Sequence, residues 1–180
     1  MFSQNNSNSE RADSTSKQLM TLEKEGIMAV QRGDYTSAIH LFSKVLELSP
    51  DYEHGMIHYN LACAFEDSGE IDAAETHYLK ALEFYPDDPV RLGGLASFMY
   101  LHRKPADAFD AYFRLLKLQL EQGLTQSAEK SVMALMTLGE KLGWSKEEMS
   151  GRIEELKSKV SGPIKVTPVG REKSRENKDK

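Results

Sequence analysis

The sequence predicts an all-α protein built as a stack of antiparallel helix pairs. A pattern of residues recurs along the chain with a period of 34 to 36 residues. Inside each repeat the apolar residues fall at steps of three and four, which places them on one face of a helix. Short polar or glycine-containing turns separate these apolar runs. A fixed period of this length indicates stacked supersecondary units.

Three blocks carry the repeat, and they begin at Gly33, Gly69 and Arg103. Alanine recurs at one position of the blocks and an aromatic residue four positions later: Ala38, Ala74 and Ala108, followed by Phe42, Tyr78 and Tyr112. A second apolar pattern precedes each block and contains a small residue: Gly26, Ala62 and Ala96. We expect the small residues to let the two helices of a unit approach, and the aromatic residues to fill the space between units. One helix pair cannot bury its apolar face alone, so the units must stack.

These residues resemble the tetratricopeptide repeat, a 34-residue unit of two antiparallel helices. The middle block matches the family pattern best, through Leu61, Ala62, Phe65, Ala74, Tyr78, Ala81 and Pro86. This block departs from the pattern at His58, and the first and third blocks depart at Glu25 and Leu120. The resemblance implies a TPR-like α-solenoid, a right-handed superhelical stack. In that family the first helix of each pair lines a concave groove that binds extended peptides or partner helices.

The domain boundaries follow from where the pattern begins and stops. We expect a disordered N-terminal tail over residues 1–17, because its polar composition cannot bury enough apolar area to offset the entropy of ordering. Three repeats follow over residues 18–122, at about 19–52, 55–88 and 89–122. A divergent helix pair over residues 123–160 is expected to cap the stack, with Gly143 ending its first helix and a capping box of Ser145 and Glu148 starting its second. Residues 161–180 are expected to form a disordered basic tail.

Candidate partner-binding residues come from the groove positions of the family. Carried onto this chain, these positions are Met20, Glu23, Ile27, Val30, Met56, Tyr59, Asn60, Cys63, Glu66, Asp67, Val90, Ser97, Tyr100 and Leu101. Tyr59 and Tyr100 are expected to face the groove from neighbouring units without joining the helices of their own pairs. A groove with Glu23, Glu66 and Asp67 and no opposing cation repels a carboxylate tail. We therefore expect the partner to offer an apolar or amphipathic segment with basic residues.

Two known groups of proteins sharpen this expectation. One subfamily of cochaperones clamps a C-terminal carboxylate with two lysines, two asparagines and an arginine. The matching positions in this chain are Glu23, Ile27, Asn60, Val90 and Gly94, and only Asn60 agrees. The chain also looks like the class II chaperones of type III secretion systems in size, acidity and three-repeat architecture, which implies a chaperone-like module.

Catalytic and metal-binding chemistry has few candidate residues. His54 and His58 are four residues apart, a spacing that puts both on one helical face and can bind a metal, but no third ligand has diagnostic spacing. Cys63 is the single cysteine, and no histidine or lysine stands in the sequence where it would lower the thiol pKa. Phosphate-binding loops, nucleophile elbows and zinc motifs are missing from the sequence. We therefore expect no catalytic residue, no metal and no cofactor.

The charge distribution limits which kinds of partner the chain is expected to bind. The net charge is −5, and it divides into −8 for the body of the chain and +3 for the C-terminal tail. An acidic body repels phosphate backbones, so we expect no nucleic-acid partner. No apolar run reaches the roughly 18 residues of a membrane helix, and the N-terminus carries no signal-peptide pattern. A soluble, cytoplasmic protein without membrane insertion is the expectation.

The sequence therefore predicts a non-enzymatic interaction module, an adaptor or chaperone-like protein that binds another protein in its groove. Two alternatives stay open at this point. The chain could be a structural subunit that self-associates through the groove or its terminal helices. It could also be a metal protein or enzyme built around His54, His58 or Cys63.

Overall fold

Helices make up the part of the chain that the computed structural model describes, which is the backbone of residues 4–160 and the side chains of residues 13–160 except that of His54. The elements are α1 (Gln4–Gln31), α2 (Tyr35–Leu48), the 3₁₀ turn η1 (Tyr52–Gly55), α3 (Met56–Ser68), α4 (Ile71–Phe84), α5 (Pro89–His102), α6 (Pro105–Glu121), α7 (Thr125–Lys141) and α8 (Lys146–Val160). Residues 4–160 contain no strand. The prediction of an all-α fold is confirmed.

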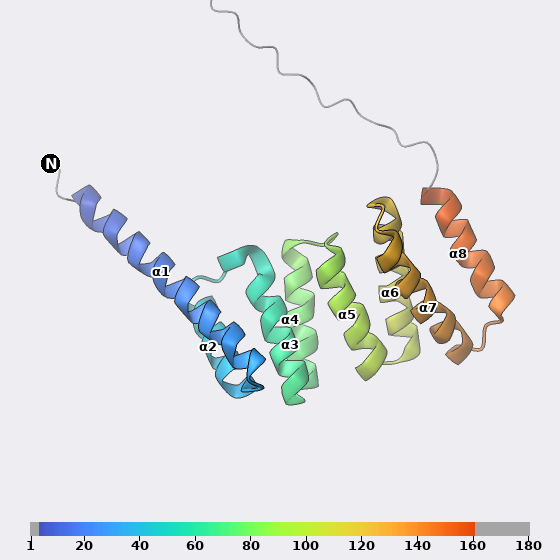
Figure 1. The fold of residues 1–180 in the computed structure, drawn as a ribbon, viewed down its shortest axis with the longest axis horizontal. Helices are drawn as coiled ribbons and strands as arrows, with labels where there is room; N and C mark the ends of the chain where they lie inside the picture. The colour runs from blue at the N-terminus through green and yellow to red at the C-terminus, as the bar shows by residue number, and fades with distance from the viewer. Residues whose placement is uncertain (1–3, 161–180) are drawn as a thin grey trace, which may run out of the picture.

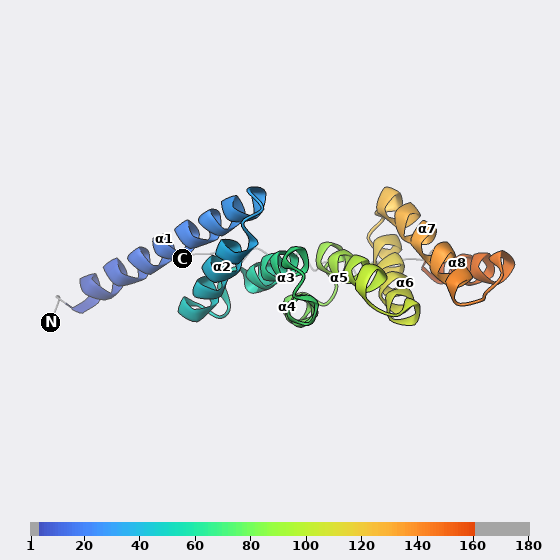
Figure 2. The ribbon, with the colours of Figure 1, turned by 90° about the horizontal axis from the view of Figure 1, so that it is seen from below.

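Consecutive helices pair and the pairs stack in chain order, from α1–α2 at one end to α7–α8 at the other (Figures 1 and 2). Contacts of α2 with α3, of α4 with α5 and of α6 with α7 join successive pairs. The result is an elongated array in which the blue N-terminal helix and the red C-terminal helix lie at opposite ends (Figure 1). No helix within residues 4–160 has both the length and the apolar character needed to cross a bilayer.

Local capping chemistry determines where several helices begin and end. Gly69 closes α3 with a φ of 86°, a left-handed conformation that glycine adopts without steric cost. The Asp88 carboxylate accepts the Val90 N–H at 2.9 Å at the start of α5. The expected capping box of α8 is present, because Ser145 N–H donates to Glu148 Oε2 at 2.7 Å and Glu148 N–H donates to Ser145 Oγ at 3.1 Å. Each bond satisfies an amide that the helix itself leaves free.

The small residues of the repeat lie where helices approach most closely. Ala62 and Ala96 are fully buried. A Cβ atom added to Gly26 would lie 2.5 Å from the Phe42 ring, so no larger residue fits there without movement. The aromatic positions differ from one another, since Phe42 and Tyr78 are buried whereas Tyr112 is only half-buried.

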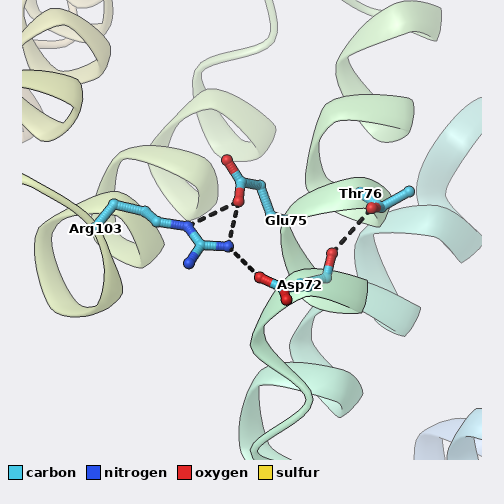
Figure 3. Close-up of polar contacts among 4 residues, drawn as sticks. All are labelled: Asp72, Glu75, Thr76 and Arg103. Carbon is cyan, nitrogen blue, oxygen red and sulfur yellow. Dashed lines mark hydrogen bonds and ion pairs between the residues drawn. The ribbon is translucent and has the colours of Figure 1, made fainter.

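An ion-pair cluster on the surface joins the second and third pairs. Arg103, directly after α5, donates from Nε to Glu75 at 2.8 Å and from Nη2 to Asp72 at 2.8 Å (Figure 3). Both acids belong to α4, and the backbone carbonyl of Asp72 also accepts the Thr76 hydroxyl at 2.9 Å. A fork of donors that spans two acids orients the pairs more than it stabilises them.

The ends of the chain differ from the sequence prediction at one point. A disordered tail was expected over residues 1–17, but α1 begins at Gln4 and runs through this segment. Among the described side chains of α1, those of residues 13–18 are exposed, and the first buried ones are Leu19 and Leu22. Once these leucines anchor the helix, each further residue is added at little cost, so polar composition alone does not end it. The expected basic tail, residues 161–180, lies outside the described residues.

Candidate partner-binding groove

A hollow of about 620 Å³ opens between the first helices of three successive pairs, α3, α5 and α7. Its lining comprises Tyr59 and Glu66 of α3, Tyr78 of α4, Pro89, Val90, Gly93, Gly94 and Ser97 of α5, Tyr112, Leu115 and Gln119 of α6, and Leu124, Ser127, Lys130 and Ser131 at α7. We call this cavity the α3–α5–α7 hollow. First helices supply most of its lining, and α4 and α6 supply the rest.

The candidate groove residues do not share one surface. Tyr59, Glu66, Val90 and Ser97 line the α3–α5–α7 hollow. Met20, Glu23 and Ile27 line a separate hollow of about 610 Å³ on α1, with Tyr52 and Glu53 of η1 at its side. The other candidates line neither of these two hollows: Val30, Met56, Asn60, Cys63, Asp67, Tyr100 and Leu101. The structure thus divides the expected groove into two hollows.

Tyr59 is part of the packing between helices. A Cβ atom added to Gly94 would lie 2.6 Å from the Tyr59 ring. The ring also meets Tyr78 edge-on with centroids 5.7 Å apart, and burial raises the pKa of Tyr59 to about 12. Tyr59 thus also packs between successive pairs, because its ring fills the space that Gly94 leaves between α3 and α5.

Tyr100 does not line this hollow and contacts residues of α6 and α7. Its ring meets Tyr112 edge-on at 6.2 Å, and the Lys141 ammonium sits 4.7 Å from its centroid. Such a cation–π contact occupies one face of the ring. Tyr59 and Tyr100 thus do not line one surface, although both come from first helices.

Glu66 is engaged within the protein. Its Oε2 accepts the Tyr78 hydroxyl at 2.8 Å, and its Oε1 lies 2.9 Å from His102 Nε2 on α5. Lys130, from α7, lines the same hollow. The expectation of a groove without an opposing cation is therefore wrong. Sequence reasoning missed Lys130 because α7 does not follow the repeat pattern that located the other groove positions.

The hollow also has a polar contact that sequence reasoning missed. The Ser131 hydroxyl donates to Gln119 Oε1 at 2.7 Å between α7 and α6. Both side chains are buried, with exposed fractions of 2% for Ser131 and 6% for Gln119. A signal was available, because Ser131 stands on the same helical face as Ala128 and Leu135. A polar residue inside an apolar stripe usually has a partner.

The candidate reactive residues have other surroundings. Cys63 Sγ lies 3.5 Å from the Tyr78 hydroxyl, and burial raises the pKa of its thiol, which disfavours the nucleophilic thiolate. His58 Nδ1 lies 2.9 Å from His77 Nδ1, so one ring donates and the other accepts. Burial lowers the pKa of His77 to about 4 and lowers that of His58 as well. Across residues 13–160, leaving out His54, no three His, Cys, Asp or Glu side chains gather as a metal site.

Comparison with known families and curated proteins finds related sequences. Residues 24–89 match the family described as tetratricopeptide repeat. The chain is 30% identical over 82 residues to the Photosystem I assembly protein Ycf3 of Synechococcus elongatus, a match that covers 45% of this chain and 47% of that protein. A Ycf3 protein from Synechococcus sp. matches with the same identity and coverage. The chain thus spans about half the length of these curated relatives.

Solved structures share the architecture. The first TPR of Spaghetti (RPAP3) bound to the HSP90 peptide SRMEEVD aligns with a TM-score of 0.60 at 18% identity, over 71% of this chain and 95% of that one. A MamA crystal structure aligns with a TM-score of 0.64 at 16% identity, over 86% and 83% of the two chains. BtubC from P. vanneervenii aligns with a TM-score of 0.63 at 16% identity, over 90% and 70%. At these identities the likeness shows the fold alone.

Proposed function

We propose that this chain, which carries tetratricopeptide repeats, is a non-enzymatic interaction module that binds a segment of a partner protein in the α3–α5–α7 hollow. The observation that carries the proposal is the hollow itself, which spans three successive pairs. Val90 lines it with 63% of its surface exposed, and Gly93, which has no side chain, lines it as well. An exposed apolar side chain next to open backbone suits the close approach of a helix or extended strand.

The relatives support a role in assembly. The curated matches carry the name of an assembly protein, and an adaptor or chaperone-like role for this chain is in keeping with that name. The photosystem in the name belongs to those relatives, and we do not carry it over. The peptide SRMEEVD in the RPAP3 structure ends in a carboxylate, and this chain has only Asn60 among the five positions used to clamp such an end.

The partner segment that fits best is amphipathic. Its apolar face would cover Val90 and Gly93, and a basic residue would lie near Asp67, which is exposed at the end of α3. Glu66 offers less to a partner, since Tyr78 and His102 already bond to its two oxygens. We further propose that the chain acts without catalysis, and a cytoplasmic location stays a prediction.

A matched pair of variants tests the proposal. A partner is first captured with the wild-type chain and identified by mass spectrometry. Val90→Asp puts a charge into the hollow, and Leu79→Asp puts the same charge on an exposed apolar residue of α4. In titration calorimetry, we expect Val90→Asp to lower the affinity for the partner at least about tenfold, and Leu79→Asp to bind the partner like wild type. Both variants should have the melting temperature of wild type. If Val90→Asp binds the partner with wild-type affinity, the hollow is not the binding site.

Self-association is a second candidate function, favoured by one observation. Met20, Ile27 and Met28 expose 62%, 41% and 45% of their surfaces on α1, at the open end of the stack. Exposed apolar residues of this kind often mark an interface. Light scattering on the purified chain decides the matter. A monomer at all concentrations excludes this function, whereas a dimer that Met20→Lys dissociates supports it.

A further inference from the structure

We infer that the α7 side of the α3–α5–α7 hollow is a recognition subsite for the carboxylate of an Asp or Glu side chain within the partner segment. This inference rests on the proposed function and adds the chemistry of one subsite to it. Three features carry it: the amide donor of a mostly buried side chain, a cation without an acidic partner, and apolar side chains next to both.

The amide donor is Gln119. Its side chain is 6% exposed and lines the hollow from α6. The Ser131 hydroxyl occupies its Oε1, which leaves the amide nitrogen as the group available to the hollow. This nitrogen makes no hydrogen bond with any side chain or backbone group among the described residues. The amide nitrogen of Gln119 can therefore donate to an acceptor that a ligand in the hollow supplies.

The cation is Lys130 on α7, which precedes Ser131 in sequence and lines the same hollow. Within residues 13–160 its ammonium forms no ion pair with a described acid. The acid of the hollow, Glu66, comes from α3 and is held by Tyr78 and His102. The unbalanced charge on the α7 side is therefore positive, and an anionic group of the partner would be attracted to it.

The number and kind of donors favour a carboxylate. One ammonium and one neutral amide match a single negative charge with two acceptor oxygens, whereas phosphate sites usually gather arginine forks or several backbone amides. Leu115 and Leu124 line the hollow beside these donors. The apolar side chains of these leucines favour a partner with apolar residues on both sides of its acid. An Asp or Glu within a continuous segment has neighbours on both sides. Partners of this subsite would thus carry an acid flanked by apolar residues.

The test uses a phage-displayed library of random peptides of about 15 residues, long enough for four helical turns. The full chain is the bait, in wild-type form and as Lys130→Glu. We expect peptides selected on wild type to share an internal Asp or Glu beside apolar residues, and peptides selected on Lys130→Glu to carry Lys or Arg at that place. Lys44→Glu, the same charge change on an exposed residue of α2, is the matched control and should select the wild-type motif.

Binding of one selected synthetic peptide then measures each group. Gln119→Glu keeps the size of the side chain and the oxygen that accepts from Ser131, but it replaces the donor with an acceptor. We expect Lys130→Glu and Gln119→Glu each to lower the affinity for the peptide at least about tenfold, and Lys44→Glu to leave this affinity unchanged. Circular dichroism and the melting temperature show whether each variant is folded, and the exposed Lys130→Glu keeps the test valid if Gln119→Glu unfolds.

The outcomes separate the subsite from the proposed function. Selected peptides could bind Val90→Asp more weakly than wild type but bind Lys130→Glu and Gln119→Glu with wild-type affinity. This result would support the hollow as the binding site and overturn the carboxylate subsite. Loss of binding when the peptide C-terminus is amidated would overturn the side-chain assignment in favour of a terminal carboxylate. Selected peptides that bind Val90→Asp as they bind wild type would overturn the proposed function as well.

Discussion

The middle pair, α3–α4, and the C-terminal pair, α7–α8, reach close packing with different residues. The middle pair buries Ala62 and Ala74, the alanines that the family pattern places there. In the C-terminal pair Gly139 takes the small position, and a Cβ atom added to it would lie 2.4 Å from Met149 Cγ. The comparison shows that helix pairs require a small residue at the point of close approach, but not at one position of a fixed pattern.

The two pairs also differ in what they offer a ligand. The middle pair contributes Tyr59 and Glu66 to the α3–α5–α7 hollow, and both are already packed or hydrogen-bonded within the protein. The C-terminal pair contributes Lys130 and Ser131, and the ammonium of Lys130 remains available. The divergent pair, which was expected only to cap the stack, thus supplies the cation of the hollow that remains available to a ligand.

The largest expected effect is at the contact of the C-terminal pair. Gly139→Leu places a branched side chain where Met149 already sits, so we expect it to lower the free energy of unfolding by about 3 kcal/mol and to release α8 from α7. Gly151→Leu on α8 is the control, because a Cβ atom there meets no atom within 4 Å. Urea denaturation measures the loss, and protease cutting near Gly143 reports the released helix. Equal stability of the two variants would show that α8 does not depend on this contact.

The corresponding change in the middle pair is Ala62→Leu. Ala62 has no exposed surface, so the added atoms must displace neighbours between α3 and α4, and we expect a loss of about 2 kcal/mol. Ala106→Leu, at an exposed position near the start of α6, serves as the control. Thermal and urea unfolding provide the measurement. A neutral Ala62→Leu would mean that the repeat register assigned to the middle pair is wrong.

The smallest expected effect concerns the His58–His77 contact, which has no counterpart in α7–α8 because that pair contains no histidine. Burial lowers the pKa of His77 from 6.5 to about 4 and also lowers that of His58. Lys80 contributes to both shifts, while Glu83 opposes that of His58. The folded state therefore binds fewer protons than the unfolded state between these values. Stability should be complete above pH 6.5 and decline as the pH falls towards 4.

We expect this loss to amount to about 1 kcal/mol, since partial solvent exposure weakens the penalty of charging the rings. Urea denaturation at several pH values between 7 and 4 measures it for wild type and for His77→Gln. The variant keeps a hydrogen-bonding side chain and should show a smaller decline with acid. An identical pH dependence of the two proteins would show that the decline arises from other groups.

Only part of the candidate site could be predicted from the sequence. The repeat located Val90 and Ser97 on first helices, and both line the hollow. The same positions in the first repeat supplied Met20 and Ile27, which line a different hollow. Repeat position tells which face of a helix a residue occupies, but not how far one pair is rotated against the next. That rotation depends on the sizes of all the side chains between the pairs.

The sequence by itself determined the helices, their order and many of their ends. Apolar steps of three and four, the small residues at close approaches and the capping pair Ser145 and Glu148 act over a few residues, so their effect can be read locally. Residues 24–89 match the repeat family that these patterns resemble. The N-terminal boundary was the exception, because the propagation of α1 back to Gln4 depends on an anchored helix rather than on composition.

Only the tertiary structure decided which charges are free and which are engaged. Glu66 meets His102 across 36 residues of sequence, and Tyr100 meets Lys141 from another pair. Gln119 and Ser131 come together from neighbouring pairs, and both line the hollow. Partners such as these are set by the stacking of whole helices, whereas periodicity and capping depend on neighbours within one or two turns. The availability of Lys130 therefore follows from the packing of the stack, which no local pattern encodes.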